Sequence, residues 1–211
     1  MKFLIIGNRR TGSEMLATFM CSHPSGMWCF KEMAYDFVPK MVDNQGCILR
    51  YTELDKWENP NLQEYKLIHI LRRNIVAHTV SDIITCCGWR GAHRYGEYTE
   101  HYPAVKMTLD LDKFNRWGKK NVELTLKYFN MFKSTSLPIF YEDITNNITV
   151  KTMPQDIADK ICDFLGIERS ALTTKMCKVN SMDYKNYITN YQDIENFDAD
   201  WVVKCREGGS A

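Results

Sequence analysis

Short apolar runs alternate with segments of helical periodicity along most of the chain. Residues 2–6 form an apolar run that stops at Gly7, and residues 67–71 form a second such run. Residues 137–144, LPIFYEDI, are a third case of a strand-like segment followed by a helix. Continuous apolar runs of this length are typical of strands that are buried on both faces of a sheet. The pattern therefore predicts three buried strands.

Helical spacing of apolar residues follows these runs. From Ser13 onward the apolar residues recur every three or four positions until SHPSG ends the segment. Asn74 is a candidate N-cap for a helix that runs to about residue 84. Further helices are predicted near residues 112–132 and 154–165. Strands that alternate with helices predict an α/β protein: a P-loop-like, three-layer fold with a mostly parallel sheet flanked by helices.

The bulk composition predicts one domain and a local binding site. The 211 residues are 45% apolar, which suits a single domain over residues 1–211, with residues 205–211 as a flexible tail. The net charge of +1 is too small for a general nucleic-acid or membrane coat, so neither is expected as a partner. No apolar run approaches the roughly 20 residues of a membrane span, and the first run is too short for a signal peptide.

Cysteine usage favours a reducing compartment. The eight cysteines are scattered and form no C-x-x-C motif, which favours free thiols in the cytoplasm over a disulfide framework. No Cys/His group has the spacing of zinc ligands. We therefore expect a cytoplasmic protein without a structural metal.

The loop after the first strand, GNRRTGSEML, resembles a phosphate-binding P-loop without its lysine. Gly7 and Gly12 match G-x-x-x-x-G-K-[ST], but Ser13 stands where the lysine should be. A helix N-terminus still favours an anion, Arg10 adds a fixed positive charge, and Thr11 and Ser13 offer hydroxyl donors. The loop thus predicts an anion site that works without magnesium. An ordinary glycine turn with solvated arginines is the alternative.

A second candidate site follows the second strand. Arg73 ends that strand, and Ser81 lies eight residues further, about two turns into the next helix. Together they can hold a phosphate through charge-assisted hydrogen bonds. Arg72 can share this task or face the other way. The alternative is that the arginine lies on the surface and that the serine forms a hydrogen bond within its own helix.

In combination these motifs resemble PAPS-dependent sulfotransferases (PAPS is 3′-phosphoadenosine 5′-phosphosulfate), of the bacterial and phage branch related to carbohydrate sulfotransferases. The family's [KR]-[ST]-G-[ST]-x-x-L loop is RTGSEML at residues 10–16, and its R-[ND]-P motif is RNI at residues 73–75, followed by Ser81. The late segments FYEDI and IADKICDFLGI resemble the family's tyrosine-glutamate strand and final helix. Two residues depart from the pattern, Ile75 in place of proline and Glu14 in place of a small residue.

This resemblance implies a transfer of the sulfuryl group from PAPS to a hydroxyl or amine of a small-molecule or carbohydrate acceptor. The product would be PAP, the 3′,5′-bisphosphate. Arg73 and Ser81 would bind the 3′-phosphate, and Arg10 would also act in catalysis by meeting charge on the leaving phosphate. The 5′ end of the donor would be bound by six consecutive residues: Arg9, Arg10, Thr11, Gly12, Ser13 and Glu14.

The resemblance also implies a catalytic base. Aryl and steroid sulfotransferases use a histidine about two dozen residues before the 3′-phosphate arginine, where this chain has residues 47–50 and no histidine. Other branches use a glutamate after the first helix, and Glu32 is predicted to take that role here. His23 and His101 are the alternatives. A solvated surface carboxylate is the plain interpretation of Glu32.

Several assignments stay open on sequence grounds. Trp28, Trp89 and Tyr95 are equal candidates for stacking on adenine, and residues 86–104 and 178–192 are candidates for the acceptor wall. Two other functions remain, a magnesium-dependent P-loop kinase of a small metabolite and a non-catalytic nucleotide-binding module. Neither the acceptor nor the oligomeric state is predicted.

Overall fold

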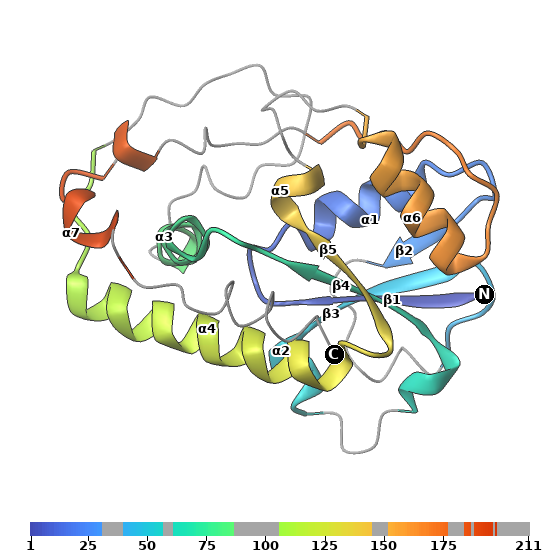
Figure 1. The fold of residues 1–211 in the computed structure, drawn as a ribbon, viewed down its shortest axis with the longest axis horizontal. Coiled ribbons are helices and arrows are strands. Elements are labelled where there is room, and N and C mark those ends of the chain that lie inside the picture. The colour runs from blue at the N-terminus through green and yellow to red at the C-terminus, as the bar shows by residue number, and fades with distance from the viewer. Residues whose placement is uncertain are drawn as a thin grey trace.

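A parallel sheet forms the centre of the molecule (Figure 1). The computed structural model describes residues 1–30, 40–56, 61–86, 106–144, 152–176, 184–186, 188–195 and 197. Within these residues five strands pair in the order β2-β3-β1-β4-β5, and every pairing is parallel. The strands are β1 (Lys2–Gly7), β2 (Trp28–Phe30), β3 (Gln45–Arg50), β4 (Lys66–Leu71) and β5 (Ser136–Phe140). The predicted fold class is confirmed.

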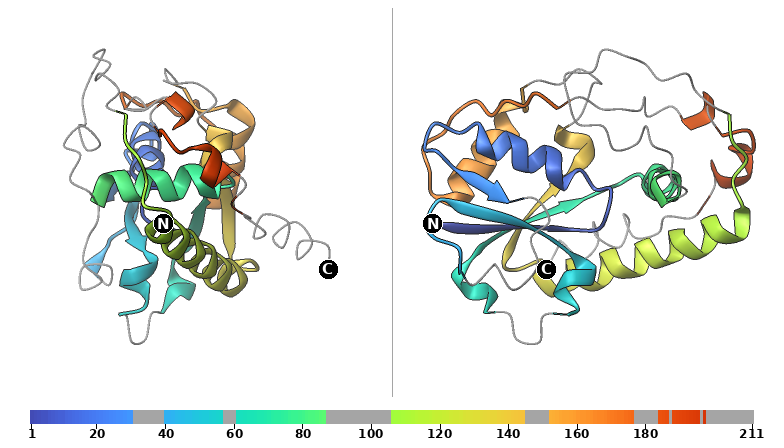
Figure 2. Two further views of the ribbon diagram at one scale, coloured as in Figure 1. Left: turned by 90° about the vertical axis from the view of Figure 1, so that its left-hand side faces the viewer. Right: turned by 180° about the vertical axis from the view of Figure 1, so that it is seen from behind.

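Helices cover both faces of this sheet (Figure 2). The elements α1 and α6 lie on one face, α2 and α4 lie on the other, and α3 extends from the carboxyl end of β4 (Figures 1 and 2). Two short 3₁₀ turns cover Leu62–Glu64 and Tyr184–Asn186. The α-helices are α1 (Ser13–Cys21), α2 (Tyr51–Leu54), α3 (Ile75–Cys86), α4 (Leu111–Phe132), α5 (Tyr141–Ile144), α6 (Gln155–Leu165) and α7 (Gln192–Glu195).

The alternation of β1 divides the core into two layers. Phe3 and Ile5 pack with the buried faces of α1 and α6, while Leu4 and Ile6 pack with α2 and α4. Successive side chains of a strand point to opposite faces, so a strand that is apolar throughout is buried on both sides. This two-sided burial fixes the position of β1 and of the loop that follows it.

One strand prediction needs correction, and two strands were not predicted. Residues 137–144 do not form one strand, because β5 ends at Phe140 and residues 141–144 turn into the short helix α5. The sequence pattern does not predict β2, which has three residues, or β3, which begins Gln45-Gly46. Gly46 weakens the strand pattern but is required, because a Cβ there would lie 2.1 Å from the ring of Phe3.

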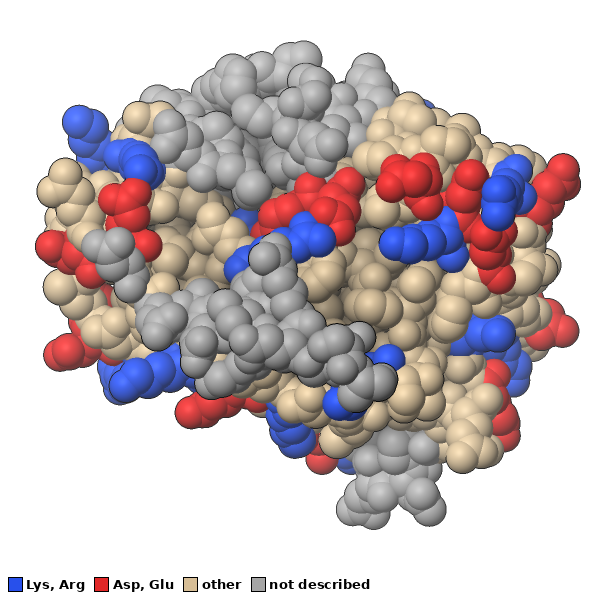
Figure 3. Space-filling view, viewed as in Figure 1, with Lys and Arg blue, Asp and Glu red and all other residues tan. Residues whose placement is uncertain are grey.

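Within the described residues, both edges of the sheet offer little for further pairing. The edge strand β2 spans three residues, and the edge strand β5 contains Pro138, which has no N–H to donate. Among the described residues, no helix is both long and apolar enough to cross a membrane. Acidic and basic side chains are interspersed over the face seen in Figure 3, in line with the net charge of +1.

Candidate anion-binding site

Three loops meet at the carboxyl edge of the sheet. Gly7 at the end of β1 is in register with Arg50 at the end of β3 and with Ile70 near the end of β4. The segments that follow these strands are therefore neighbours, although they are about 20 to 65 residues apart in sequence. Ligands of open α/β sheets bind at this edge. We call residues 8–12 the first loop and residues 72–74 the β4–α3 turn.

The backbone of the first loop is arranged for an anion. Arg10 (φ 61°) and Gly12 (φ 87°) adopt left-handed conformations, and α1 begins directly afterwards. No side chain caps α1, and among the described residues the N–H groups of Thr11, Gly12 and Ser13 have no hydrogen-bond acceptor. Exposed N–H groups at a helix N-terminus carry partial positive charge. The loop can thus accept a phosphate or sulfate group.

Side chains of the first loop reach across to α3. The Arg10 Nε donates to Ser81 Oγ at 3.2 Å, so the structure brings these two predicted site residues together. The Thr11 hydroxyl donates to the Asn8 carbonyl oxygen at 2.8 Å and is buried. Thr11 therefore offers a ligand its backbone N–H and not its hydroxyl. The sequence analysis expected the hydroxyl.

The β4–α3 turn is paired with carboxylates from α5. The two terminal nitrogens of Arg73 donate to Asp143 at 2.5 and 2.8 Å, and this pairing is the main cause of the raised pKa of Arg73. Glu142 accepts from the backbone N–H of Arg73 at 3.0 Å and of Asn74 at 3.1 Å. Glu142 thus has a structural role at the start of α3. Arg73 contacts Asp143 rather than Ser81.

Arg72 faces the first loop instead of solvent. Its guanidinium is 5% exposed, lies 4.8 Å from the ring centre of Tyr141, and donates to the Arg10 carbonyl oxygen at 3.1 Å. Its Nε lies 3.9 Å from a Glu142 oxygen. The same tyrosine ring closes over Gly12, where a Cβ would lie 2.3 Å from it. The end of β5 therefore supports both the first loop and the β4–α3 turn.

A buried carboxylate lies among the cations of the site. Asp82 on α3 is 7% exposed, and its Oδ1 lies 4.0 Å from the Arg9 Nε. Burial raises the pKa of the Asp82 carboxyl even though nearby cations act to lower it. These cations are Arg9, Arg10, Arg50 and Lys120. Asp82 was not predicted from the sequence, where its only signal is its position next to Ser81.

Arg50 was also missed as a member of the site. It ends β3, and burial, followed by the charge of Arg9, lowers its pKa. The carboxylates of Glu53, Glu14 and Asp82 act in the opposite direction. Glu14 therefore lies close enough to balance part of the cationic charge. A cation at the end of a strand is the signal that could have identified Arg50.

Other predicted candidates lie elsewhere or outside the described residues. His23 is buried after α1, with its ring nitrogens bonded to the Ser25 hydroxyl and the Glu168 carbonyl oxygen, both at 2.8 Å. Trp28 is in register with the first residue of β3, so it lies at the amino edge of the sheet, roughly 16 Å from the carboxyl edge. Glu32, His101, Trp89, Tyr95 and most of the predicted acceptor wall fall outside the residues that the structure describes.

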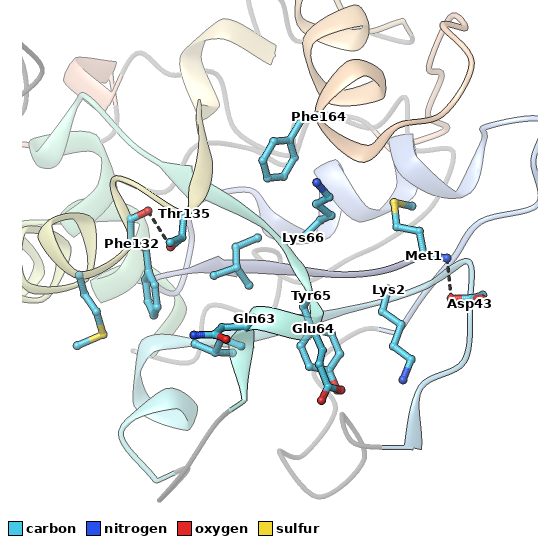
Figure 4. A pocket seen from close by; sticks show the side chains of 13 residues that line it. Met1, Lys2, Asp43, Gln63, Glu64, Tyr65, Lys66, Phe132, Thr135 and Phe164 are labelled. Atoms are coloured by element: carbon cyan, nitrogen blue, oxygen red, sulfur yellow. Dashed lines mark hydrogen bonds and ion pairs between the residues drawn. The ribbon is translucent and has the colours of Figure 1, made fainter.

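The rest of the described structure offers no rival site with matching chemistry. No group of three or more His, Cys, Asp or Glu side chains in it is arranged to hold a metal ion. The described cysteines form no disulfide with one another. A cavity of about 700 Å³ lies at the amino edge of the sheet, lined by Lys2, Tyr65, Lys66 and Phe164 among others (Figure 4). None of the predicted site residues lines it.

Comparison with known proteins identifies the fold. No protein-family model matches the sequence, and no curated protein is recognisably similar to it. The structure matches mouse sulfotransferase SULT7A1 complexed with PAP at a TM-score of 0.60, with 14% identity over 100% of this chain and 89% of that one. The chain has the sulfotransferase fold. The sulfotransferase domain of the Synechococcus PCC 7002 olefin synthase matches at a TM-score of 0.45, with 12% identity over 98% and 87%.

Proposed function

We propose that this protein is a sulfotransferase that uses PAPS as its donor and a small molecule or carbohydrate as its acceptor. The observation that carries the proposal is the contact between Arg10 Nε and Ser81 Oγ at 3.2 Å. It joins the two motifs that resemble the 5′ and 3′ sites of the family, at the carboxyl edge of a sheet with the sulfotransferase fold. The mouse protein of that fold is complexed with PAP.

The first loop would hold the phosphosulfate. The N–H groups of Thr11, Gly12 and Ser13 face no acceptor among the described residues, and Arg10 reaches the same space from the loop. Donors held in place before the reaction stabilise charge as it develops. In the transfer, the S–O bond to the leaving phosphate breaks while a new S–O bond forms to the acceptor. Arg10 would then stabilise the charge that collects on the leaving phosphate.

The β4–α3 turn would hold the 3′-phosphate through Arg73 and Ser81. Arg73 is about one third exposed and is paired with Asp143, so a phosphate would exchange for that carboxylate. Ser81 would turn from Arg10 to the phosphate. A phosphate oxygen suits the planar guanidinium fork at least as well as a carboxylate does. This exchange would let the site distinguish PAPS from nucleotides without a 3′-phosphate.

The acceptor hydroxyl needs a base, and we assign this role to Glu32. A carboxylate beside the acceptor can take the hydroxyl proton as the new S–O bond forms.

Arg9 and Glu14 flank the loop on the side of Arg50, where their charges would border the bound donor. The entire chain, residues 1–211, would form one catalytic domain.

The test is a comparison of PAP with 5′-AMP in thermal unfolding. PAP should raise the melting temperature clearly more than 5′-AMP at equal concentration, because only PAP fills the 3′ site. Arg73→Ala should lose most of this difference. Arg169→Ala is the matched control, since Arg169 makes the same two-bond pairing with Asp163 far along the chain. Equal shifts of the melting temperature by PAP and 5′-AMP in the unaltered protein would contradict the proposed 3′-phosphate site.

Turnover is measured with labelled PAPS and a panel of hydroxyl and amine acceptors. The unaltered protein should transfer label to at least one acceptor, and Glu32→Gln should bind PAP normally while losing at least about 100-fold in rate. Binding of PAP without transfer to any acceptor would favour a non-catalytic module. Full activity in Glu32→Gln would assign the base to another residue.

A further inference from the structure

We propose that His78 and Arg72 are positioning residues that hold the first loop in its donor-binding shape. The inference rests on the proposed function, because it concerns the same loop. Neither residue is expected to touch the donor. Both act on the loop from behind, through the backbone carbonyl oxygens of Arg9 and Arg10.

The His78 contact is short and buried. His78 lies on α3, is 1% exposed, and places its Nε2 at 2.6 Å from the Arg9 carbonyl oxygen. A carbonyl oxygen can only accept, so Nε2 must carry the hydrogen. Burial, followed by the charge of Arg72, lowers the pKa of His78 to about 3, which keeps the ring neutral at ordinary pH. His78 is thus a fixed neutral donor.

The Arg72 contact is made one residue further along the loop. Its guanidinium donates to the Arg10 carbonyl oxygen at 3.1 Å and lies 4.8 Å from the centre of the Tyr141 ring. The two donors come from the same β4–α3 segment, six residues apart. They therefore fix two consecutive peptide groups of the first loop against one rigid element.

Fixing a carbonyl also fixes an N–H group. The peptide unit is planar and trans, so the C=O of Arg9 and the N–H of Arg10 point in opposite directions, and so do the C=O of Arg10 and the N–H of Thr11. The two contacts turn both carbonyls toward α3 and β4. The two N–H groups consequently face away from that support.

The conformation that results is unfavourable for an arginine. Arg10 has φ 61°, in the left-handed region that residues other than glycine rarely adopt. Such a conformation persists only where the surroundings hold it. His78 and Arg72 supply this support on either side of the Arg10 backbone, so the loop is shaped before the donor arrives. Shaping the loop in advance reduces the ordering that binding requires.

The test compares His78→Leu with His78→Gln. Leucine has a similar size but no donor, whereas the glutamine amide can replace the Nε2–H group. Hydrogen exchange of the peptide that covers residues 8–16, which includes the hydrogen-bonded N–H groups of Arg9 and Leu16, should be faster in His78→Leu and close to normal in His78→Gln. The Kd for PAP should rise about tenfold with leucine and less than about threefold with glutamine, as expected for one buried hydrogen bond.

A control separates positioning from general loss of stability. Ile83→Ala removes buried volume from the same helix, in an apolar cluster that includes no residue of the first loop, so it should destabilise the protein without faster exchange in the loop. Normal loop exchange in His78→Leu, or a glutamine variant as impaired as the leucine one, would overturn the inference. If the unaltered protein fails to bind PAP, the proposed function fails, while the exchange contrast still decides whether His78 shapes the loop.

Discussion

The first loop and the β4–α3 turn lie side by side, yet they differ in what occupies their donors. In the first loop the carbonyl oxygens are bonded from behind, and the N–H groups of Thr11 and Gly12 have no acceptor in the described part of the chain. In the β4–α3 turn, Glu142 accepts from two N–H groups, and Asp143 pairs with Arg73. One site is open to an anion, and the other already holds carboxylates.

The difference has a consequence for how the two sites share affinity and selectivity. An anion can enter the first loop without breaking any backbone contact of the described residues, whereas an anion at Arg73 must displace a charged partner. The first loop should therefore set most of the affinity for the 5′ end. The β4–α3 turn should add selectivity, because only a ligand with a second phosphate can replace Asp143.

The largest effect is expected from Gly12→Ala. The new Cβ would meet the Tyr141 ring at 2.3 Å in a left-handed backbone, so the variant should lose about 3 kcal/mol of unfolding free energy and most of its PAP binding. Gly166→Ala is the control, because Gly166 also has a left-handed φ of 73° but no heavy atom within 4 Å of its Cβ position. The control should lose only about 1 kcal/mol in urea unfolding. Equal losses would mean that Tyr141 does not constrain the first loop.

A smaller effect is expected from acid. Because burial lowers the folded pKa of His78 from 6.5 to about 3, the unfolded chain binds more protons between these values, and stability falls as the pH falls. This residue alone should remove about 2 kcal/mol between pH 7 and pH 5. Urea unfolding of His78→Gln should therefore show a correspondingly shallower dependence on pH. An unchanged dependence would show that His78 is not the neutral donor described above.

The smallest effect is expected from Asp143→Asn. Loss of this carboxylate frees Arg73 for a phosphate, so PAP should bind about threefold more tightly while 5′-AMP binds as before, in titration calorimetry. Asp163→Asn removes the similar partner of Arg169 and should leave both affinities unchanged. Weaker PAP binding in Asp143→Asn would mean that Asp143 supports the 3′ site and does not compete with the phosphate.

The sequence predicted the parts of the site that are local in the chain. The first loop follows directly from an apolar run, two glycines and a helix start, so the position of Arg10 could be read from consecutive residues. The eight-residue spacing from Arg73 to Ser81 likewise lies within one strand-helix unit. The contact between the two units needed only the general rule that parallel strands end at one edge.

Partners from distant parts of the chain could not be predicted. Whether Arg72 or Arg73 faces the first loop depends on packing against Tyr141 and on where the two carboxylates of α5 lie, about 70 residues away. Gly46 weakened the strand pattern of β3, although a glycine is needed there because the ring of Phe3 leaves no space for a Cβ. Since β3 was not predicted, the position of Arg50 at its end was not predicted either. These features are determined by tertiary contacts that no local pattern records.

The proline in β5 has a consequence for the solubility of the protein at high concentration. A parallel sheet with an open margin can pair with a strand from a neighbouring chain, and such pairing leads to aggregation. Here Pro138 interrupts the row of hydrogen-bond donors along one margin, and three of the described residues form the other. Pro138→Val would restore that row, and we expect the altered protein to remain folded but to precipitate at lower concentration.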